Sequence, residues 1–79
     1  MGIIRKRIVE LCQRADGFCE DDIQEIREAS SAADVAGKLF DVLGATDFRP
    51  QDRDAAWTAY QLAVSIANNQ RINEIDSVI

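Results

Sequence analysis

The stretch "RADGFCEDDIQEI" gathers acidic side chains around a glycine, a combination that can bind a metal ion. An EF-hand calcium loop has glycine at its sixth position and a bidentate glutamate at its twelfth, with further oxygen ligands that include the first and third positions. When Gly17 takes the sixth position, Cys12, Arg14 and Ile23 fall on the first, third and twelfth. None of these side chains has a carboxylate, so the sequence argues against a calcium loop of this type.

The side chains that most enzymes and zinc sites use are scarce in this chain. There is no histidine, and the two cysteines are Cys12 and Cys19. A structural zinc site takes four ligands, mainly Cys and His, and a cysteine nucleophile needs a neighbouring base or cation. The four glycines are scattered and match no nucleotide-binding loop. We therefore expect no catalytic activity, no metal and no cofactor, and reduced cysteines rather than a disulfide.

Charge divides the chain into a short basic segment and a long acidic one, with a net charge of −5. Residues 1–15 hold four basic side chains and one acidic one, whereas residues 16–54 hold eleven acidic and four basic ones. Helix capping and solubility are one explanation of such an acidic segment. The alternative is a surface that attracts a basic partner protein and steers its approach.

The acidic side chains that we expect to form this surface belong to two segments. They are Asp21, Asp22, Glu25, Glu28, Asp47, Asp52 and Asp54. The spacing of Asp21, Glu25 and Glu28 puts them on one face of a helix. The three aspartates of the second segment extend that face if both helix–helix joins lie at the same end of the molecule.

Apolar residues recur at three- and four-residue spacing almost throughout. This spacing predicts one all-α domain over residues 1–79, a small compact bundle of four or five short helices. The first helix is expected to end at Gly17 in a left-handed cap, the second to start near Glu20 or Asp21, and the third to be closed by Gly44. The inward-facing residues of these three helices are expected to be Ile4, Ile8, Leu11, Cys12, Ala15, Ile23, Ile26, Val35, Leu39, Val42 and Leu43.

Capping residues mark the starts of the last two helices. Ser31 and Asp34 have the spacing of a capping box, and Pro50 suits the first turn of a fourth helix. We expect the inner face of that helix to consist of Trp57, Tyr60, Val64 and Ala67. If Trp57 and Tyr60 lie outside the core instead, they are candidates for an exposed anchor at an interface.

The segment after the fourth helix, "QRINEIDSVI", has a further set of apolar residues. Ile72, Ile75 and Ile79 lie at helical spacing, so the fourth helix could continue or restart there. Together with Trp57 and Tyr60, we take Ile72 and Ile75 as a candidate face for a dimer or a partner.

The two joins before the second and fourth helices share a pattern thirty residues apart. The corresponding residues are Ala15, Phe18 and Asp22 in one and Ala45, Phe48 and Asp52 in the other. We interpret the aromatic residue as a core-filling side chain and the acid as the start of the next helix. The "ADG" turn followed by acids and "IQEI" also resembles the turn motif of tellurite-resistance TerB-like helical domains, a likeness confined to that turn.

These features favour a non-catalytic, acidic, cytoplasmic protein-binding module. We expect a small inhibitor or modulator of a basic nucleic-acid-binding protein complex, comparable in size and charge to phage-encoded anti-defence proteins of the anti-CRISPR kind. One alternative is a small helix–turn–helix DNA-binding regulator, which would need Arg5, Lys6 and Arg7 on one exposed face. Another is a homodimerising structural subunit. The acids at the start of the fourth helix argue against direct nucleic-acid binding, and neither a membrane span nor a signal peptide is expected.

Overall fold

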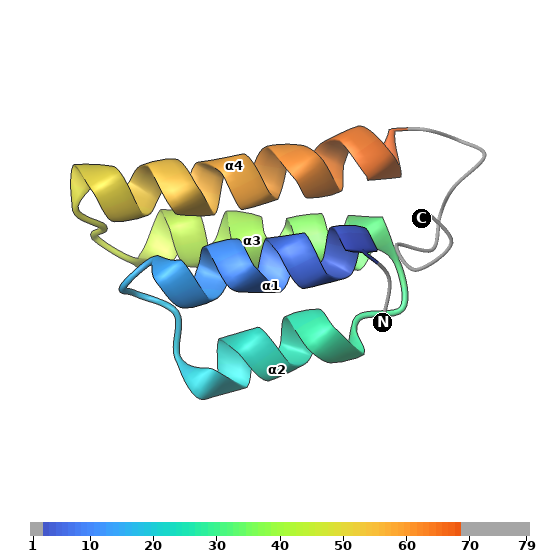
Figure 1. Cartoon of the computed structure of the whole chain (residues 1–79), viewed down its shortest axis with the longest axis horizontal. Helices are drawn as coiled ribbons and strands as arrows, with labels where there is room; N and C mark the ends of the chain where they lie inside the picture. The colour runs from blue at the N-terminus through green and yellow to red at the C-terminus, as the bar shows by residue number, and fades with distance from the viewer. Residues whose placement is uncertain (1–2, 69–79) are drawn as a thin grey trace.

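The computed structural model describes residues 3–68, which form four α-helices (Figure 1). The helices are α1 (Ile3–Arg14), α2 (Glu20–Glu28), α3 (Ala32–Ala45) and α4 (Pro50–Ala67). Each helix packs against the next one along the chain, and α4 also packs against α1, so the four close into a ring. The prediction of a small all-α bundle is confirmed. The segment with Ile72, Ile75 and Ile79 lies outside the described residues.

The residues predicted to begin α3 and α4 lie at the starts of these helices. Ser31 is the N-cap of α3, and its Oγ accepts a hydrogen bond from the backbone N–H of Asp34 at 3.2 Å. The carboxylate of Asp34 accepts from Ser30 Oγ at 3.1 Å, so one half of the predicted capping box is formed. Pro50 opens α4 as predicted. Within residues 3–68, no helix is long and apolar enough to cross a membrane.

Gly17 is required for a different reason from the one predicted. No described glycine has a positive φ, so the expected left-handed cap is wrong. A Cβ atom at Gly17 would instead overlap the ring of Phe48, whose Cδ1 atom would lie 2.8 Å away. The absence of a side chain at this position therefore lets Phe48 pack directly against the turn between α1 and α2.

Most of the large side chains of the core come from α1, α2 and α3. The predicted inward-facing residues of these helices are all buried except Ile4, which is partly buried. The largest side chains with no exposed surface are Ile8, Ile26, Leu39 and Val35. Burial of side chains of this size is the main favourable contribution to folding.

The predicted inner face of α4 is only partly correct, because Tyr60 and Ala67 pack against the core as partly buried residues but do not form its fully buried stripe. The core-facing stripe of this helix consists of Ala56, Ala59 and Ala63, which have no exposed surface. Trp57 is 48% exposed, and Tyr60, Val64 and Ala67 are partly buried. Because α1 and α3 both pack against α4 and supply larger side chains, short alanine side chains on α4 let the helices approach closely.

The two joins that share a sequence pattern lie at the same end of the bundle (Figure 1). Phe18 from the first join and Phe48 from the second pack together, with ring centroids 5.6 Å apart and an interplanar angle of 39°. This tilted arrangement is favourable for aromatic pairs. The interpretation of both aromatic residues as core-filling side chains is confirmed, and the contact ties the α1–α2 pair to the α3–α4 pair.

Candidate protein-binding surfaces

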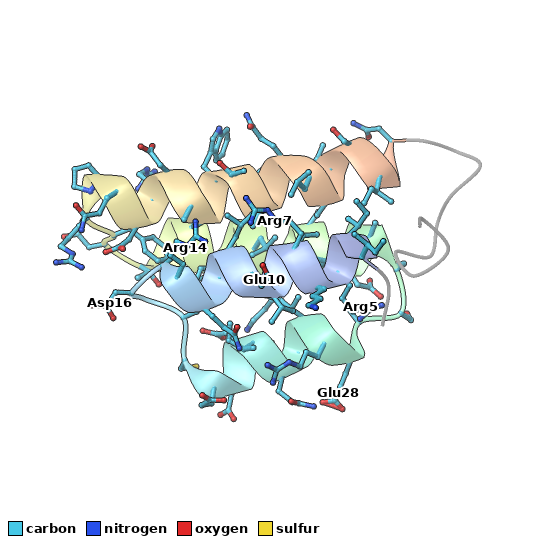
Figure 2. All side chains as sticks on the ribbon, viewed as in Figure 1. Arg5, Arg7, Glu10, Arg14, Asp16 and Glu28 are labelled. Atoms are coloured by element: carbon cyan, nitrogen blue, oxygen red, sulfur yellow. The ribbon has the colours of Figure 1, made fainter. Side chains whose placement is uncertain are left out.

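The outer face of α2 presents three acidic side chains, which we call the acidic ridge: Asp21, Glu25 and Glu28. All three are exposed, and Figure 2 shows Glu28 projecting away from the bundle at the end of the helix. The core-facing side of α2 contributes only Ile23 and Ile26 as buried residues. The helical spacing in the sequence was therefore sufficient to place the acidic ridge on one face.

Asp22, also expected on this surface, is turned toward α3. It is half-buried, and its carboxylate lies 2.8 Å from the Nζ atom of Lys38 and accepts a hydrogen bond from the backbone N–H of Cys19 at 3.2 Å. The hydrogen bond from Lys38 lowers the pKa of Asp22, against the effect of partial burial. Lys38 also contacts Glu25 Oε2 at 2.5 Å, and its own pKa is raised, chiefly by the hydrogen bond to Asp22.

The aspartates of the second acidic segment divide into buried and exposed ones. Asp52 is 6% exposed and accepts a hydrogen bond from Arg49 Nε at 2.9 Å, which raises the pKa of Arg49. Asp47 and Asp54 are exposed. Both joins lie at one end of the bundle, yet α2 and α4 lie across the ring from each other (Figure 1). The exposed Asp54 on α4 is therefore separated from the acidic ridge, whereas Asp47 lies in the join between α3 and α4.

Arg5 has a role that sequence analysis missed. Its side chain is 5% exposed and lies between α1 and the last turn of α2 (Figure 2). The guanidinium donates hydrogen bonds to the backbone carbonyls of Ile26 at 2.9 Å, Arg27 at 2.6 Å and Ala29 at 2.7 Å. These carbonyls end a helix and have few partners within it, and a cation there is favoured by the helix dipole. Arg5 thus caps α2.

Three aromatic side chains on α3 and α4 form a second exposed surface, which we call the aromatic patch: Phe40, Trp57 and Tyr60. Phe40 and Trp57 are 62% and 48% exposed. Tyr60 lies between them, with ring centroids 6.1 Å from Phe40 and 5.2 Å from Trp57. Trp57 and Tyr60 are brought together as a pair, whereas Ile72 and Ile75 lie outside the described residues. Phe40 was not among the predicted site residues.

The two cysteines of the described residues lie in different surroundings. Burial raises the pKa of the Cys12 thiol to about 12, and Cys19 is exposed with a free thiol. Within residues 3–68, no three Cys, Asp or Glu side chains are arranged to hold a metal ion, and this part of the chain forms no pocket. The surface features of this region are accordingly the acidic ridge and the aromatic patch.

Comparison of the chain with family models, with curated proteins and with solved structures gave no match. The likeness of the Gly17 turn to TerB-like domains therefore gains no support from a family match.

Both missed residues left a signal in the sequence. Arg5 stands three residues before Ile8 and seven before Cys12, so it lies on the buried stripe of α1. Phe40 directly follows the core residue Leu39. Because successive helical residues are rotated by about 100°, Phe40 lies off the buried stripe that Val35, Leu39 and Val42 form.

Proposed function

We propose that this chain is a small acidic protein-binding module that inhibits or modulates a basic, nucleic-acid-binding protein or complex. The main support is the acidic ridge on α2, where Asp21 and Glu28 are exposed and form no ion pair with any described residue. A net charge of −5 on 79 residues adds to this negative field. Clustered charge of one sign attracts a partner of the opposite sign and accelerates its association.

The mechanism is competition for a basic surface. Proteins that bind nucleic acids do so through lysine and arginine side chains that contact phosphates. A helix that displays several carboxylates can occupy such a surface and block the nucleic acid. Because these contacts are exposed, their strength falls as salt concentration rises and screens the charges.

The helix–turn–helix alternative has less support. It requires Arg5, Lys6 and Arg7 to act together on one face, but the Arg5 guanidinium is buried against the end of α2. The Nη1 atom of Arg7 lies 3.9 Å from the Oε2 atom of Glu10 on the same helix, so Arg7 is paired with an acid. The start of α4, which would approach DNA in that arrangement, has Asp52 and Asp54 in its first two turns, and phosphates repel such carboxylates.

The test is capture of partners by the tagged protein from a lysate of the source organism, at low and high salt. We expect a stoichiometric, salt-sensitive nucleic-acid-binding protein. The double variant Asp21→Lys/Glu28→Lys should lose it, since both exposed carboxylates become cations, and neither residue forms an ion pair with the rest of residues 3–68. Asp22 is unsuitable for reversal because it bonds Lys38 and Cys19.

Glu28→Lys and Glu10→Lys make a matched pair, because each reverses one exposed helical glutamate and changes the net charge equally. We expect Glu28→Lys to weaken capture and Glu10→Lys, on α1, to leave it intact. Undiminished capture by the double variant would show that the acidic ridge serves only solubility and capping. Equal weakening by both single variants would show that net charge acts without a defined surface.

A further inference from the structure

The aromatic patch exposes more apolar surface than the fold requires. Phe40 is 62% exposed and Trp57 is 48% exposed, yet the two lie on neighbouring helices with Tyr60 packed between them. Single exposed apolar residues are common on protein surfaces, whereas a contiguous group is typical of interaction sites. Tryptophan and tyrosine are also among the residues that contribute most to binding energy at interfaces.

Two glycines lie on the exposed side of α3, close to Phe40. Gly37 and Gly44 lie three residues before and four residues after Phe40, on the same side of the helix. A Cβ atom at either glycine would meet nothing within 4 Å, so packing within the described chain does not require them. Glycine inside a helix costs about 1 kcal/mol relative to alanine. Small residues on both sides of an exposed aromatic ring allow another helix to approach α3 closely.

The charges around the aromatic patch determine which kind of helix fits. Asp41 directly follows Phe40, and Asp54 precedes Trp57 by three residues on α4. Both are exposed, and neither forms an ion pair with any described residue. Arg53 adds one positive charge beside Asp54, while Lys38 is engaged by Asp22 and Glu25 on the α2 side. Asp41, Asp54 and Arg53 together leave the margin of the aromatic patch with a net charge of −1, with the uncompensated acid on α3.

We propose that the aromatic patch binds a basic amphipathic helix of a partner protein. This inference rests on the proposed function in that the partner is basic, and it adds the surface and the structural element that are recognised. The apolar stripe of the partner helix packs on Phe40 and Trp57, as the apolar face of an amphipathic helix does on an apolar surface. Its lysine or arginine side chains reach Asp41 and Asp54. A second copy of this chain is a poorer occupant, because two equal acidic margins would face each other.

The first experiment uses a designed peptide of about 18 residues, or five helical turns. Leucine occupies positions i, i+3, i+4 and i+7 of its repeat, and lysine occupies the remaining positions. Two further peptides have glutamate in place of lysine, or the same lysine–leucine composition in scrambled order. Because Trp57 is the only tryptophan, its fluorescence reports contact directly. We expect the lysine–leucine peptide to bind and to shift Trp57 emission to shorter wavelength, and the other two to bind at least tenfold more weakly.

The second experiment locates the site with variants of the full chain. Phe40→Ala should weaken peptide binding by about tenfold or more, the loss typical of a central aromatic anchor. Ile3→Ala is the matched control, because Ile3 on α1 is also 62% exposed but lies outside the aromatic patch. Asp41→Lys should weaken binding of the lysine–leucine peptide and strengthen binding of the glutamate peptide. Circular dichroism checks that each variant retains its helices.

The outcomes separate the surface from the function. If the peptide binds equally well to Phe40→Ala and leaves Trp57 emission unchanged, the aromatic patch is not its site and the inference fails. If a natural basic partner is lost with Asp21→Lys/Glu28→Lys but kept by Phe40→Ala, the proposed function stands and the inference alone fails. If sedimentation gives a dimer of the chain that Phe40→Ala converts to a monomer, a second copy occupies the patch and the inference is overturned.

Discussion

The guanidinium of Arg5 donates a hydrogen bond to the carbonyl oxygen of Ile26 at 2.9 Å and thereby links the first turn of α1 to the last turn of α2. The same group bonds the carbonyls of Arg27 and Ala29. Hydrogen bonds to a charged donor contribute more than neutral ones, and a buried carbonyl left without a partner is costly. The arginine is accordingly a structural residue within a segment whose composition suggests a basic surface.

Replacing this arginine should destabilise the protein. We expect Arg5→Met, which keeps most of the apolar stem, to lower the free energy of unfolding by about 3 kcal/mol, because the carbonyls at the end of α2 lose a charged donor. Urea denaturation followed by circular dichroism measures the change. Lys6→Ala, at the exposed neighbouring position, should change stability by no more than about 0.5 kcal/mol. Arg5→Lys should fall between, since one ammonium lacks the planar fork of the guanidinium. Equal stability of Arg5→Met and the parent would contradict the capping role.

Replacing glycines by alanine provides a second test of stability. The change in the free energy of unfolding should have opposite signs at different glycines. Gly17→Ala should destabilise by about 1–3 kcal/mol, because the added methyl group overlaps the ring of Phe48. Gly37→Ala and Gly44→Ala should each stabilise by about 0.5–1 kcal/mol, since both sites are helical and open. Thermal or urea unfolding of the three variants is sufficient. Stabilisation by Gly17→Ala would show that Phe48 does not pack against the turn as described.

Stability should fall in acid because of Asp22. Its pKa is lowered in the folded chain, chiefly by the hydrogen bond from Lys38. A carboxylate of this kind contributes stability above its unfolded pKa of about 3.9, and the contribution is lost as pH falls through the lower folded pKa. We therefore expect the free energy of unfolding to decrease below about pH 4. Asp22→Asn should reduce that decrease, whereas Asp41→Asn, which removes an exposed carboxylate, should not. An equal acid dependence in the parent and Asp22→Asn would contradict the assignment.

The two cysteines should differ sharply in reactivity. Cys12 has no exposed surface, and burial raises the pKa of its thiol to about 12, so almost no thiolate is present near neutral pH. Cys19 is exposed. We expect a thiol reagent to label Cys19 rapidly and Cys12 only as the chain opens. In the variant Cys19→Ser, only the slow reaction of Cys12 should remain. Denaturant should make the two rates similar. Rapid labelling of two thiols in the native protein would contradict the burial of Cys12.

Sequence patterns were sufficient for the helices and for the cores of α1, α2 and α3. Ile8, Ile26 and Leu39 lie on clear stripes with helical spacing, and each is fully buried. On α4 the helical spacing of large apolar residues predicted that the stripe with Trp57 faces inward. The buried stripe instead consists of Ala56, Ala59 and Ala63, because α4 packs against two helices that already supply large side chains. Which stripe is buried depends on the partners of a helix, and its own sequence does not contain that information.

The candidate surfaces were only partly predicted from the sequence, because some of their features depend on contacts between helices. The spacing of Asp21, Glu25 and Glu28 required only the geometry of one helix, and their common exposure follows from it. The burial of Asp52 depends on how the start of α4 packs in the bundle, and the turning of Asp22 toward Lys38 depends on a contact between residues distant in sequence. The same holds for the meeting of Phe40 and Tyr60 across α3 and α4.

The way in which α2 is held has a consequence for motion. This helix buries only Ile23 and Ile26, while Arg5 reaches its last turn from α1 and Lys38 reaches its first turns from α3. A segment with little apolar burial opens locally at lower free energy than the rest of a fold. Amide protons of α2 should therefore exchange with solvent sooner than those of α3 and α4. The helix that displays the acidic ridge is thus the one that can separate from the bundle while the other three remain packed.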